Sequence, residues 1–224
     1  MRAMILAAGL GTRMRPLTDH TPKPLLKVGG KPLIVWHIER LVERGFKEIV
    51  INIAHLGWQI PKELGDGSRW GAKIIYSDEQ EEGGLESAGG IVKALPHLVT
   101  SEPFLVVNGD VWTTYTFDAT KQLEDGVLAH LVLVPNPPHN AKGDFALKEG
   151  RVINTPAYTF SGIGYYSPKL FKDVPYGKSA LAPLLREAMQ EGLVTGELYE
   201  GVWHDIGTPE RLNTLVSNLS LYSG

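Results

Sequence analysis

Blocks of apolar residues alternate with amphipathic stretches along most of the chain, and this order predicts the elements of an α/β fold. Mostly apolar runs, typical of buried parallel strands, lie at 3–7, 49–53, 72–76, 104–107 and 130–134. Helical spacing of apolar residues falls at 33–42, 56–64, 88–95 and 181–190. We therefore expect one Rossmann-like domain over 1–224, with a mostly parallel central sheet and helices on both faces.

Residues that favour helix ends refine these boundaries. Lys31-Pro32 is predicted to open the first helix, and Gly45 stands where its C-terminal cap is expected. Ser87 is the predicted N-cap of the helix at 88–95. A last helix is predicted to begin at Thr208-Pro209-Glu210 and to run to about residue 219.

Between residues 136 and 158 the pattern changes and predicts a small antiparallel β insertion, a flap within the domain. Pro137-Pro138 stands near its start, and short strand-like pieces follow at 145–148 and 151–153. A separate strand is predicted at 158–166. The sequence contains no internal repeat, linker or low-complexity tract, which favours a single domain with one insertion.

Composition narrows the class of protein without changing the predicted fold. The 224 residues carry a formal net charge of −3 and no cysteine, which excludes disulfides, thiolate metal sites and thiol nucleophiles. A mildly acidic protein gives no reason to expect a nucleic acid or a membrane as partner. No apolar run approaches the ~20 residues of a membrane-spanning helix. We expect a cytoplasmic protein, monomeric or a small homo-oligomer.

The first predicted strand leads into a glycine-rich loop, 9–16, that carries two arginines, and Lys23 follows it. Its two glycines let the backbone approach another group, and successive N–H groups in such a turn form a concave anion site. With three cations nearby, the loop favours a polyphosphate ligand over an ordinary turn. It is not a dinucleotide loop, because Met14 replaces the third glycine, and it lacks the Gly-Lys-Ser/Thr of a P-loop.

Further runs complete a longer pattern: LVVNGD at 105–110, FSGIG at 160–164 and WHDIGTPE at 203–210. With LAAGLGTRMRP at 6–16 and PKPL at 22–25, they resemble the sugar-1-phosphate nucleotidyltransferases over nearly the whole chain. Members of that family join a nucleoside triphosphate to a sugar 1-phosphate and release pyrophosphate. Many also carry a C-terminal β-helix, which we do not expect here because the last predicted element is a helix.

The resemblance implies a nucleotide site at the end of the first strand. Arg13 is expected to hold the leaving pyrophosphate, and Lys23 to lie near the α-phosphate. Gln80 and the loop at 83–88 are expected to bind the base, which we predict to be the uracil of UTP, with thymine and guanine as alternatives. The predicted nucleotide-binding residues are Ala7, Ala8, Gly9, Gly11, Thr12, Arg13, Lys23, Gln80, Gly83, Ser87 and Gly109.

The resemblance also implies a metal site formed by two carboxylates. Asp110 follows the strand at 104–107, and Asp205 lies within WHDIGTPE. Together they are expected to hold Mg²⁺ through carboxylate oxygens. Asp110 is also predicted to be a catalytic residue, as are Arg13 and Lys23. The attacking phosphate is already anionic near neutral pH, so no general base is required. His204 is expected to face away from Asp205, because neighbouring side chains on a strand point to opposite faces.

The sugar end is predicted from the same resemblance. In many relatives a Glu-Lys-Pro stretch supplies a lysine for the sugar phosphate, and that stretch is missing here. Lys142 and Lys148 are the substitutes that the sequence offers. The predicted sugar-binding residues are Asn108, Gly143, Asp144, Asn154, Thr159, Ser161 and Gly162.

Within the family, the compact length, GGLESAGG at 83–90 and Asp144-Phe145 most resemble bacterial members that transfer uridylate to N-acetylmuramate 1-phosphate in cell-wall recycling. The lactyl carboxylate of that sugar would need a donor, for which Lys142 and the backbone near Gly143 are candidates. Mannose-1-phosphate guanylyl transfer and glucose-1-phosphate thymidylyl or uridylyl transfer are alternatives. Two further alternatives come from other classes of protein. A metal-dependent glycosyltransferase would not need the loop at 9–23, and a nucleotide sensor would not need the charged catalytic residues, so these features argue against both.

Overall fold

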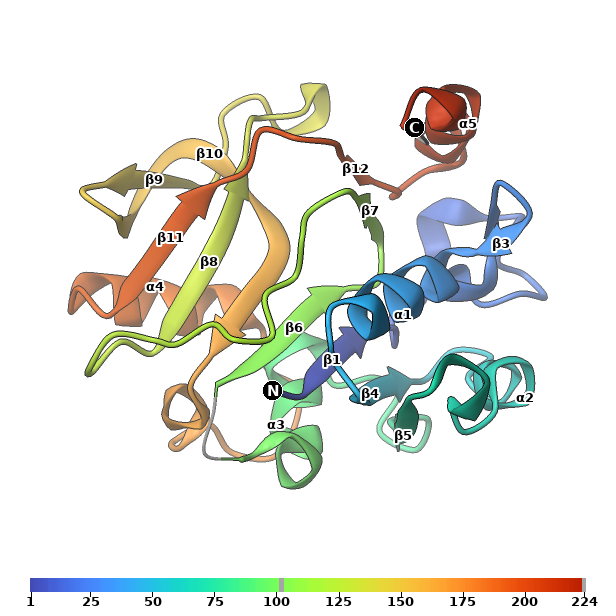
Figure 1. The fold of residues 1–224 in the computed structure, drawn as a ribbon, viewed down its shortest axis with the longest axis horizontal. Coiled ribbons are helices and arrows are strands. Elements are labelled where there is room, and N and C mark those ends of the chain that lie inside the picture. Colours follow the sequence, from blue (N-terminus) through green and yellow to red (C-terminus); the bar gives the residue numbers. More distant parts are fainter. Residues whose placement is uncertain (101–102, 223–224) are drawn as a thin grey trace.

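A computed structural model describes residues 1–100 and 103–222 of the chain. Its centre is an 8-stranded sheet in which segments far apart in the sequence lie side by side (Figure 1). The main path runs β11-β8-β10-β6-β1-β4-β5, and β9 pairs with β10. The strands are β1 (Ala3–Leu6), β4 (Glu48–Ile53), β5 (Lys73–Asp78), β6 (Phe104–Asn108), β8 (Ala129–Val134), β9 (Phe145–Lys148), β10 (Arg151–Tyr166) and β11 (Val194–Leu198).

The sheet has a parallel half and a mixed half that meet at β6. Strands β6, β1, β4 and β5 pair in parallel, whereas β10 runs antiparallel to both β6 and β8. The ends of β1 and β6 are neighbours, with Leu6 opposite Asn108. Ligands of open parallel sheets bind beyond the carboxyl ends of the strands. The loop after β1 and the residues after β6 therefore start from the same edge.

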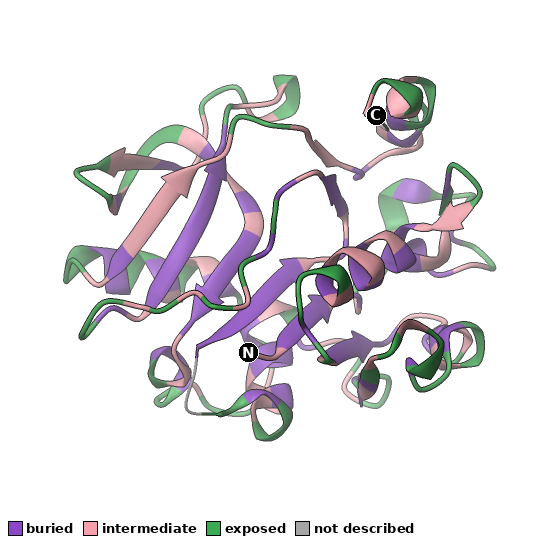
Figure 2. Ribbon diagram, viewed as in Figure 1, coloured by how far each residue is buried: buried purple, intermediate pink, exposed green. Residues whose placement is uncertain are grey.

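Helices cover both faces of the sheet, as the sequence predicts. Helix α1 (Leu33–Glu43) packs on one face, and α3 (Glu86–Leu98) and α4 (Leu181–Gln190) pack on the other. Alternate residues of β1 serve the two cores: Ile5 is buried in the cluster of Ile38 of α1, and Met4 in that of Ile91 of α3. The central strands are buried along most of their length (Figure 2).

Two small sheets lie outside the central one. Strand β7 (Val111–Thr113) pairs antiparallel with β12 (Trp203–Asp205), and β2 (Lys27–Val28) pairs with β3 (Lys31–Pro32). Helix α5 (Pro209–Asn218) follows β12 and packs on Trp112 and Leu33 in a third apolar cluster. Because β7 follows β6 closely, this pairing returns the C-terminal segment to the edge where β6 ends.

Several predicted boundaries are confirmed. Helix α4 has the predicted limits, and the predicted last helix is α5, whose N-cap hydroxyl, Thr208 Oγ1, accepts the N–H of Arg211 at 3.3 Å. Gly45 follows α1 with a φ of 93°, as expected for a C-terminal cap. The predicted flap contains β9 and the first part of β10. In the described part of the chain, no helix combines the length and apolar character required to cross a bilayer.

Other boundaries were wrong. Lys31 and Pro32 form β3, so α1 begins at Leu33, and the helix predicted at 56–64 is the shorter α2 (Gln59–Leu64). Ser87 is not an N-cap, because α3 already begins at Glu86. The Ser87 hydroxyl instead accepts the N–H of Leu181 at 2.8 Å. The two strands predicted at 151–153 and 158–166 are one strand, β10, whose pairing with β9 shifts register between them.

Candidate active site

The glycine-rich loop after β1 borders a cavity of about 300 Å³. Gly11 has a φ of 67°, a left-handed conformation that favours glycine. Its carbonyl accepts hydrogen bonds from Thr18 Oγ1 at 2.5 Å and from the N–H of Met14 at 3.1 Å, which fixes the turn. The residues that line the cavity are Ala7, Gly9, Leu10, Gly11, Thr12, Arg13, Met14, Lys23, Pro24, Asp110 and Gly207.

Two of the three predicted cations reach this cavity. Lys23 is only 8% exposed, and its Nζ lies 3.1 Å from Oδ2 of Asp110. A buried ammonium requires such an anionic partner. Arg13 lines the cavity from the loop, whereas Arg15 is exposed and its Nε lies 3.7 Å from Asp19 Oδ1. The cavity thus joins backbone N–H groups, two cations and one carboxylate.

A smaller cavity of about 210 Å³ lies beside Ala8 and Gly9 and contains a buried polar pair. Asn52 Nδ2 donates to Glu79 Oε2 at 2.8 Å, and Asn52 Oδ1 accepts the N–H of Ala7 at 2.7 Å. Burial raises the pKa of the Glu79 carboxyl, although hydrogen bonds from Asn52 and the Leu85 N–H oppose this shift. The pair connects the end of β1 to β4 and to the residue after β5. Its other lining residues are Leu6, Glu86, Ser87, Asn108 and Asp110.

Three predicted nucleotide-binding residues line neither the loop cavity nor this smaller cavity. Gln80 is exposed, and its Nε2 donates to Asp78 Oδ2 at 2.9 Å. Gly83 lies in the following turn with a φ of 73°. Gly109 packs against β1, where an added Cβ would lie 2.5 Å from the carbonyl oxygen of Leu6. The geometry assigns Gly109 to backbone packing and brings Glu79, the neighbour of Gln80, to the cavity.

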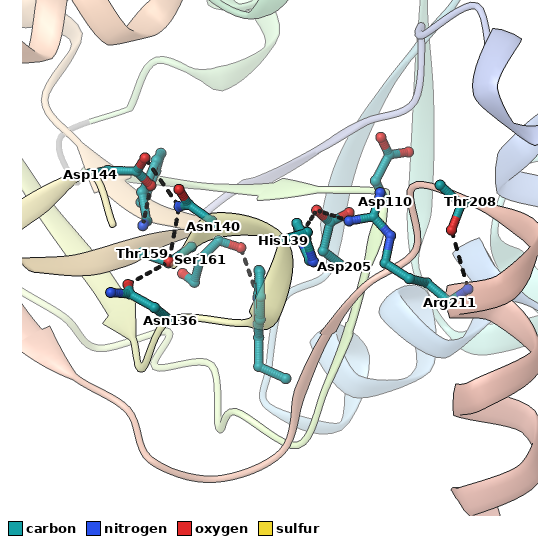
Figure 3. A network of polar contacts seen from close by, with 12 residues as sticks. Asp110, Asn136, His139, Asn140, Asp144, Thr159, Ser161, Asp205, Thr208 and Arg211 are labelled. Atoms are coloured by element: carbon teal, nitrogen blue, oxygen red, sulfur yellow. Dashed lines mark hydrogen bonds and ion pairs between the residues drawn. The ribbon is translucent and has the colours of Figure 1, made fainter. Parts of the chain in front are cut away.

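The β7–β12 ladder brings Asp110 and Asp205 to neighbouring backbone positions. Asp205 lies opposite Val111, and the N–H of Ile206 donates to the Asp110 carbonyl at 2.8 Å. Asp205 Oδ2 lies between two basic side chains, 3.1 Å from His139 Nε2 and 3.6 Å from Arg211 Nη1 (Figure 3). His204 faces the other way, as predicted, and its Nε2 lies 3.0 Å from the hydroxyl of Tyr222. Partial burial lowers the pKa of His204.

The donor set at the ladder fits a hard divalent cation. Mg²⁺ commonly takes one or two protein carboxylates and completes its octahedron with water and phosphate oxygens. Across residues 1–100 and 103–222, no cluster of three or more histidine and carboxylate side chains encloses a metal by protein ligands alone. Asp110 and Asp205 would therefore leave most coordination positions to the substrates.

A cavity of about 480 Å³ extends from Asn108 and Asp205 over the mixed half of the sheet. Asn140 Nδ2 donates to Thr159 Oγ1 at 3.0 Å and approaches Asp144 Oδ1 at 3.3 Å (Figure 3). At Gly162 a Cβ would lie 2.7 Å from that of Asn108, so only glycine allows β10 to approach β6 so closely. The polar and charged lining residues are Ser87, Asn108, His139, Asn140, Asp144, Thr159, Ser161 and Asp205.

Most predicted sugar-binding residues meet in this cavity, and two do not. Asn108, Asp144, Thr159, Ser161 and Gly162 line it. Gly143 packs instead against the backbone of Ala157, and Asn154 is exposed on β10. The nominated lysines, Lys142 and Lys148, are both exposed and line neither this cavity nor the loop cavity.

The sequence analysis missed several residues that the structure brings to the site. His139 and Asn140 lie in a 3-10 turn, Pro138–Asn140. The Pro-Pro pair at its start can be recognised in the sequence, but the residues that this turn contacts, Asp205 and Thr159, are distant in the sequence. Trp203 Nε1 donates to the Ser161 carbonyl at 3.0 Å, and Trp203 lines the cavity of about 480 Å³. Arg211 lies in the first turn of α5, two residues beyond the predicted helix start. Its closeness to Asp205 in the sequence was the one indication that it could reach the site.

Known proteins share both the sequence and the fold. The nucleotidyl transferase family model matches residues 2–220. The N-acetylmuramate alpha-1-phosphate uridylyltransferase of Neisseria meningitidis is 53% identical over 222 residues, 95% of each chain. The enzyme of the same name from Caulobacter vibrioides is 32% identical, over 93% of this chain and 92% of its own.

A solved structure agrees on the fold. A Bacillus anthracis protein assigned as a glucose-1-phosphate thymidylyltransferase superposes with a TM-score of 0.83 at 22% identity, covering 96% of this chain and 95% of its own. The Rossmann-like architecture predicted from the sequence is thus confirmed. The match of the family model over almost the whole chain shows that this protein belongs to the nucleotidyl transferase family.

Proposed function

We propose that this protein transfers uridylate from UTP to N-acetylmuramate 1-phosphate, giving UDP-N-acetylmuramate and pyrophosphate. The observation that carries the proposal is the high identity, over nearly the full length of both chains, to a Neisseria enzyme whose name states that activity. The three cavities support it, because they provide adjoining spaces for a triphosphate, a base and a sugar.

The cavities meet at Asn108–Asp110, where the reaction would take place. Asn108 lines the base and sugar cavities, and Asp110 lines the base and triphosphate cavities. Both reactants are anions, so the chain must mainly position them and neutralise their charge. The loop N–H groups and Arg13 would hold the β- and γ-phosphates that leave as pyrophosphate. Lys23 would hold the α-phosphate.

Asp110 and Asp205 would hold a divalent cation, for which we propose Mg²⁺. When bound, the metal neutralises charge between the attacking and the attacked phosphate. Asp110 would then no longer depend on Lys23 as its counter-charge, which frees that ammonium for a phosphate oxygen. Asp205 would likewise release its contacts with His139 and Arg211 in part.

We further propose that the enzyme works in the cytoplasm, in the recycling of cell-wall sugars, on these two small molecules. Neither a nucleic acid nor a membrane is needed as partner, in keeping with a net charge of −3. In such recycling, a free muramyl sugar would be converted back to a nucleotide sugar.

Pyrophosphate release tests the proposal. The purified chain is incubated with Mg²⁺ and each combination of UTP, dTTP or GTP with N-acetylmuramate, N-acetylglucosamine, glucose or mannose 1-phosphate. The expected result is the highest kcat/KM with UTP and the muramyl sugar. A preference for GTP with mannose 1-phosphate, or for dTTP with glucose 1-phosphate, would replace the proposal with that alternative. Absence of pyrophosphate with every pair would favour a glycosyltransferase or a nucleotide sensor.

A further inference from the structure

A second cavity adjoins the sugar cavity on the far side of the His139–Asp205–Arg211 contacts. It has a volume of about 600 Å³ and shares His139, Trp203 and Asp205 with the sugar cavity. Its other walls are mainly apolar, with prolines 135, 137 and 138 among them. Arg211 lines this second cavity and not the sugar cavity. A substituent that left the sugar ring between His139 and Trp203 would enter an apolar space with a guanidinium on its wall.

Arg211 has donor capacity that the fold does not use. Its guanidinium carries five N–H bonds, and its contact with Asp205 is a long one, 3.6 Å from Nη1 to Oδ2. Its Nε is buried and has no hydrogen-bond partner among the residues that the structure describes. Buried donors without a partner are rare in native proteins because they lose their hydration. An anionic group entering from the cavity would meet the accessible part of this guanidinium, whose side chain is 22% exposed.

Gly207 makes room for that guanidinium. A Cβ at Gly207 would overlap with Nη2 of Arg211, so the arginine lies directly on the backbone between Asp205 and α5. The two histidines that line the cavity have other partners, since His139 contacts Asp205 and His204 contacts the hydroxyl of Tyr222. Lys142, the cation expected from the sequence, is exposed and lines none of the cavities described above.

We propose that Arg211 recognises a carboxylate on a short ether substituent of the sugar, and so selects the N-acetylmuramyl sugar over N-acetylglucosamine. This inference rests on the proposed function. The lactyl group combines a methyl group with a carboxylate, which matches proline walls beside a guanidinium. The competing ligand is a nucleotide phosphate, because Arg13 also approaches Gly207. Arg211 does not line the loop cavity, however, and this favours the sugar substituent.

The test compares two sugars that differ only in the lactyl ether, N-acetylmuramate 1-phosphate and N-acetylglucosamine 1-phosphate, with UTP and Mg²⁺. Arg211→Met keeps the apolar stem and removes the charge. We expect kcat/KM for the muramyl sugar to fall by roughly 10- to 100-fold, the usual effect of losing a charged hydrogen bond. N-acetylglucosamine 1-phosphate, as substrate or as competitive inhibitor, has no carboxylate for Arg211, so its constants should change much less and the preference for the muramyl sugar should fall. The KM for UTP should change by less than about twofold.

Three controls decide the outcome. Arg211→Lys should recover part of the preference, and Arg186→Met, the same change at an exposed position of α4, should leave all constants unchanged. An equal loss with both sugars, or a raised KM for UTP, would assign Arg211 to the phosphates and overturn the proposal. So would a lost preference in Lys142→Ala with Arg211→Met unaffected. A wild-type chain that releases no pyrophosphate with the muramyl sugar would instead refute the proposed function itself.

Discussion

The charged residues of the site contact one another before any substrate binds. Lys23 contacts Asp110, and Asp205 is shared by His139 and Arg211. Lys23 is buried, and its ammonium would be costly without an anionic partner, so its contact with Asp110 stabilises the fold as well as the site. Substrate phosphates and a cation would replace these contacts by exchange of partners. The same residues would therefore hold one another in the free protein and hold the substrates in the complex.

Replacing either carboxylate by its amide tests this role. Asp110→Asn and Asp205→Asn should each lower kcat by at least ~100-fold, because an amide cannot neutralise a cation held between two phosphates. Pyrophosphate release at saturating substrates and sub-millimolar Mg²⁺ is the measurement, with circular dichroism to verify the fold. Near-normal turnover in either variant would contradict the proposed metal site.

At the level of elements, local signals predicted some boundaries well and failed where distant contacts decide. The N-cap at Thr208 and the apolar spacing of α4 are local features of the sequence, and both elements were predicted from them. Ser87 was misassigned because its hydroxyl bonds Leu181, far away in the sequence. The single long β10 was missed because its register shift arises from pairing with β9, which composition does not encode.

The same limit applies to the site. Family motifs pointed to the loop, Asp110 and Asp205, and the structure places these at adjoining cavities, although their roles stay predictions. His139 and Arg211 gave no comparable signal. They reach the site because they contact Asp205, and Asp205 is placed there by the ladder that joins residues 111–113 to 203–205. The amide of Gln80 was expected at the base but turns back to Asp78.

Helix α1 supports the Asp110 segment through a buried histidine. His37 lies against the backbone of Gly109 and Val111, and burial lowers its pKa to about 4. In the unfolded chain its pKa returns to about 6.5. Between pH 6.5 and 4 the unfolded state binds more protons, so protonation favours unfolding as the pH falls. The destabilisation that His37 causes is therefore complete below about pH 4 and absent above about pH 7.

Removing this histidine should therefore flatten the pH dependence of stability. We expect the wild-type chain to lose up to roughly 3 kcal/mol of unfolding free energy between pH 7 and pH 4 through His37 alone. In His37→Leu that part of the loss should vanish, measured by urea unfolding at several pH values. An unchanged slope in the variant would show that the pKa of His37 is not lowered in the folded protein.

At the scale of the whole molecule, the proposed nucleotide and sugar sites lie on different halves of the sheet. The loop cavity and the proposed base cavity lie at the ends of β1 and β4 in the parallel half, and the proposed sugar cavity lies along β10 in the mixed half. A nucleotide would thus contact mainly one half and should bind without the sugar. Ligands that bind only the folded state raise its stability by mass action.

UTP alone should therefore raise the melting temperature. At about 100 times its Kd, with Mg²⁺ present, the expected stabilisation is ~2.7 kcal/mol, or roughly 5–10 °C for a chain of this size. GTP and dTTP at equal concentration should give smaller shifts, as read by thermal denaturation. The order would be reversed if the base cavity next to Asn52 and Glu79 accepted a purine better than uracil.

The β7–β12 ladder has a consequence for how such a protein can vary. The chain leaves the ladder at Thr114 and rejoins it at Val202, where the N–H of Thr114 donates to the Val202 carbonyl at 3.1 Å. Everything between them, including the flap and β10, is a closed excursion whose two ends are held together by backbone groups. Because Asp110 and Asp205 stand just outside those ends, changes within the excursion can reshape the acceptor pocket while the spacing of the two carboxylates stays constant. Acceptor choice and phosphate chemistry can thus diverge independently within one continuous domain.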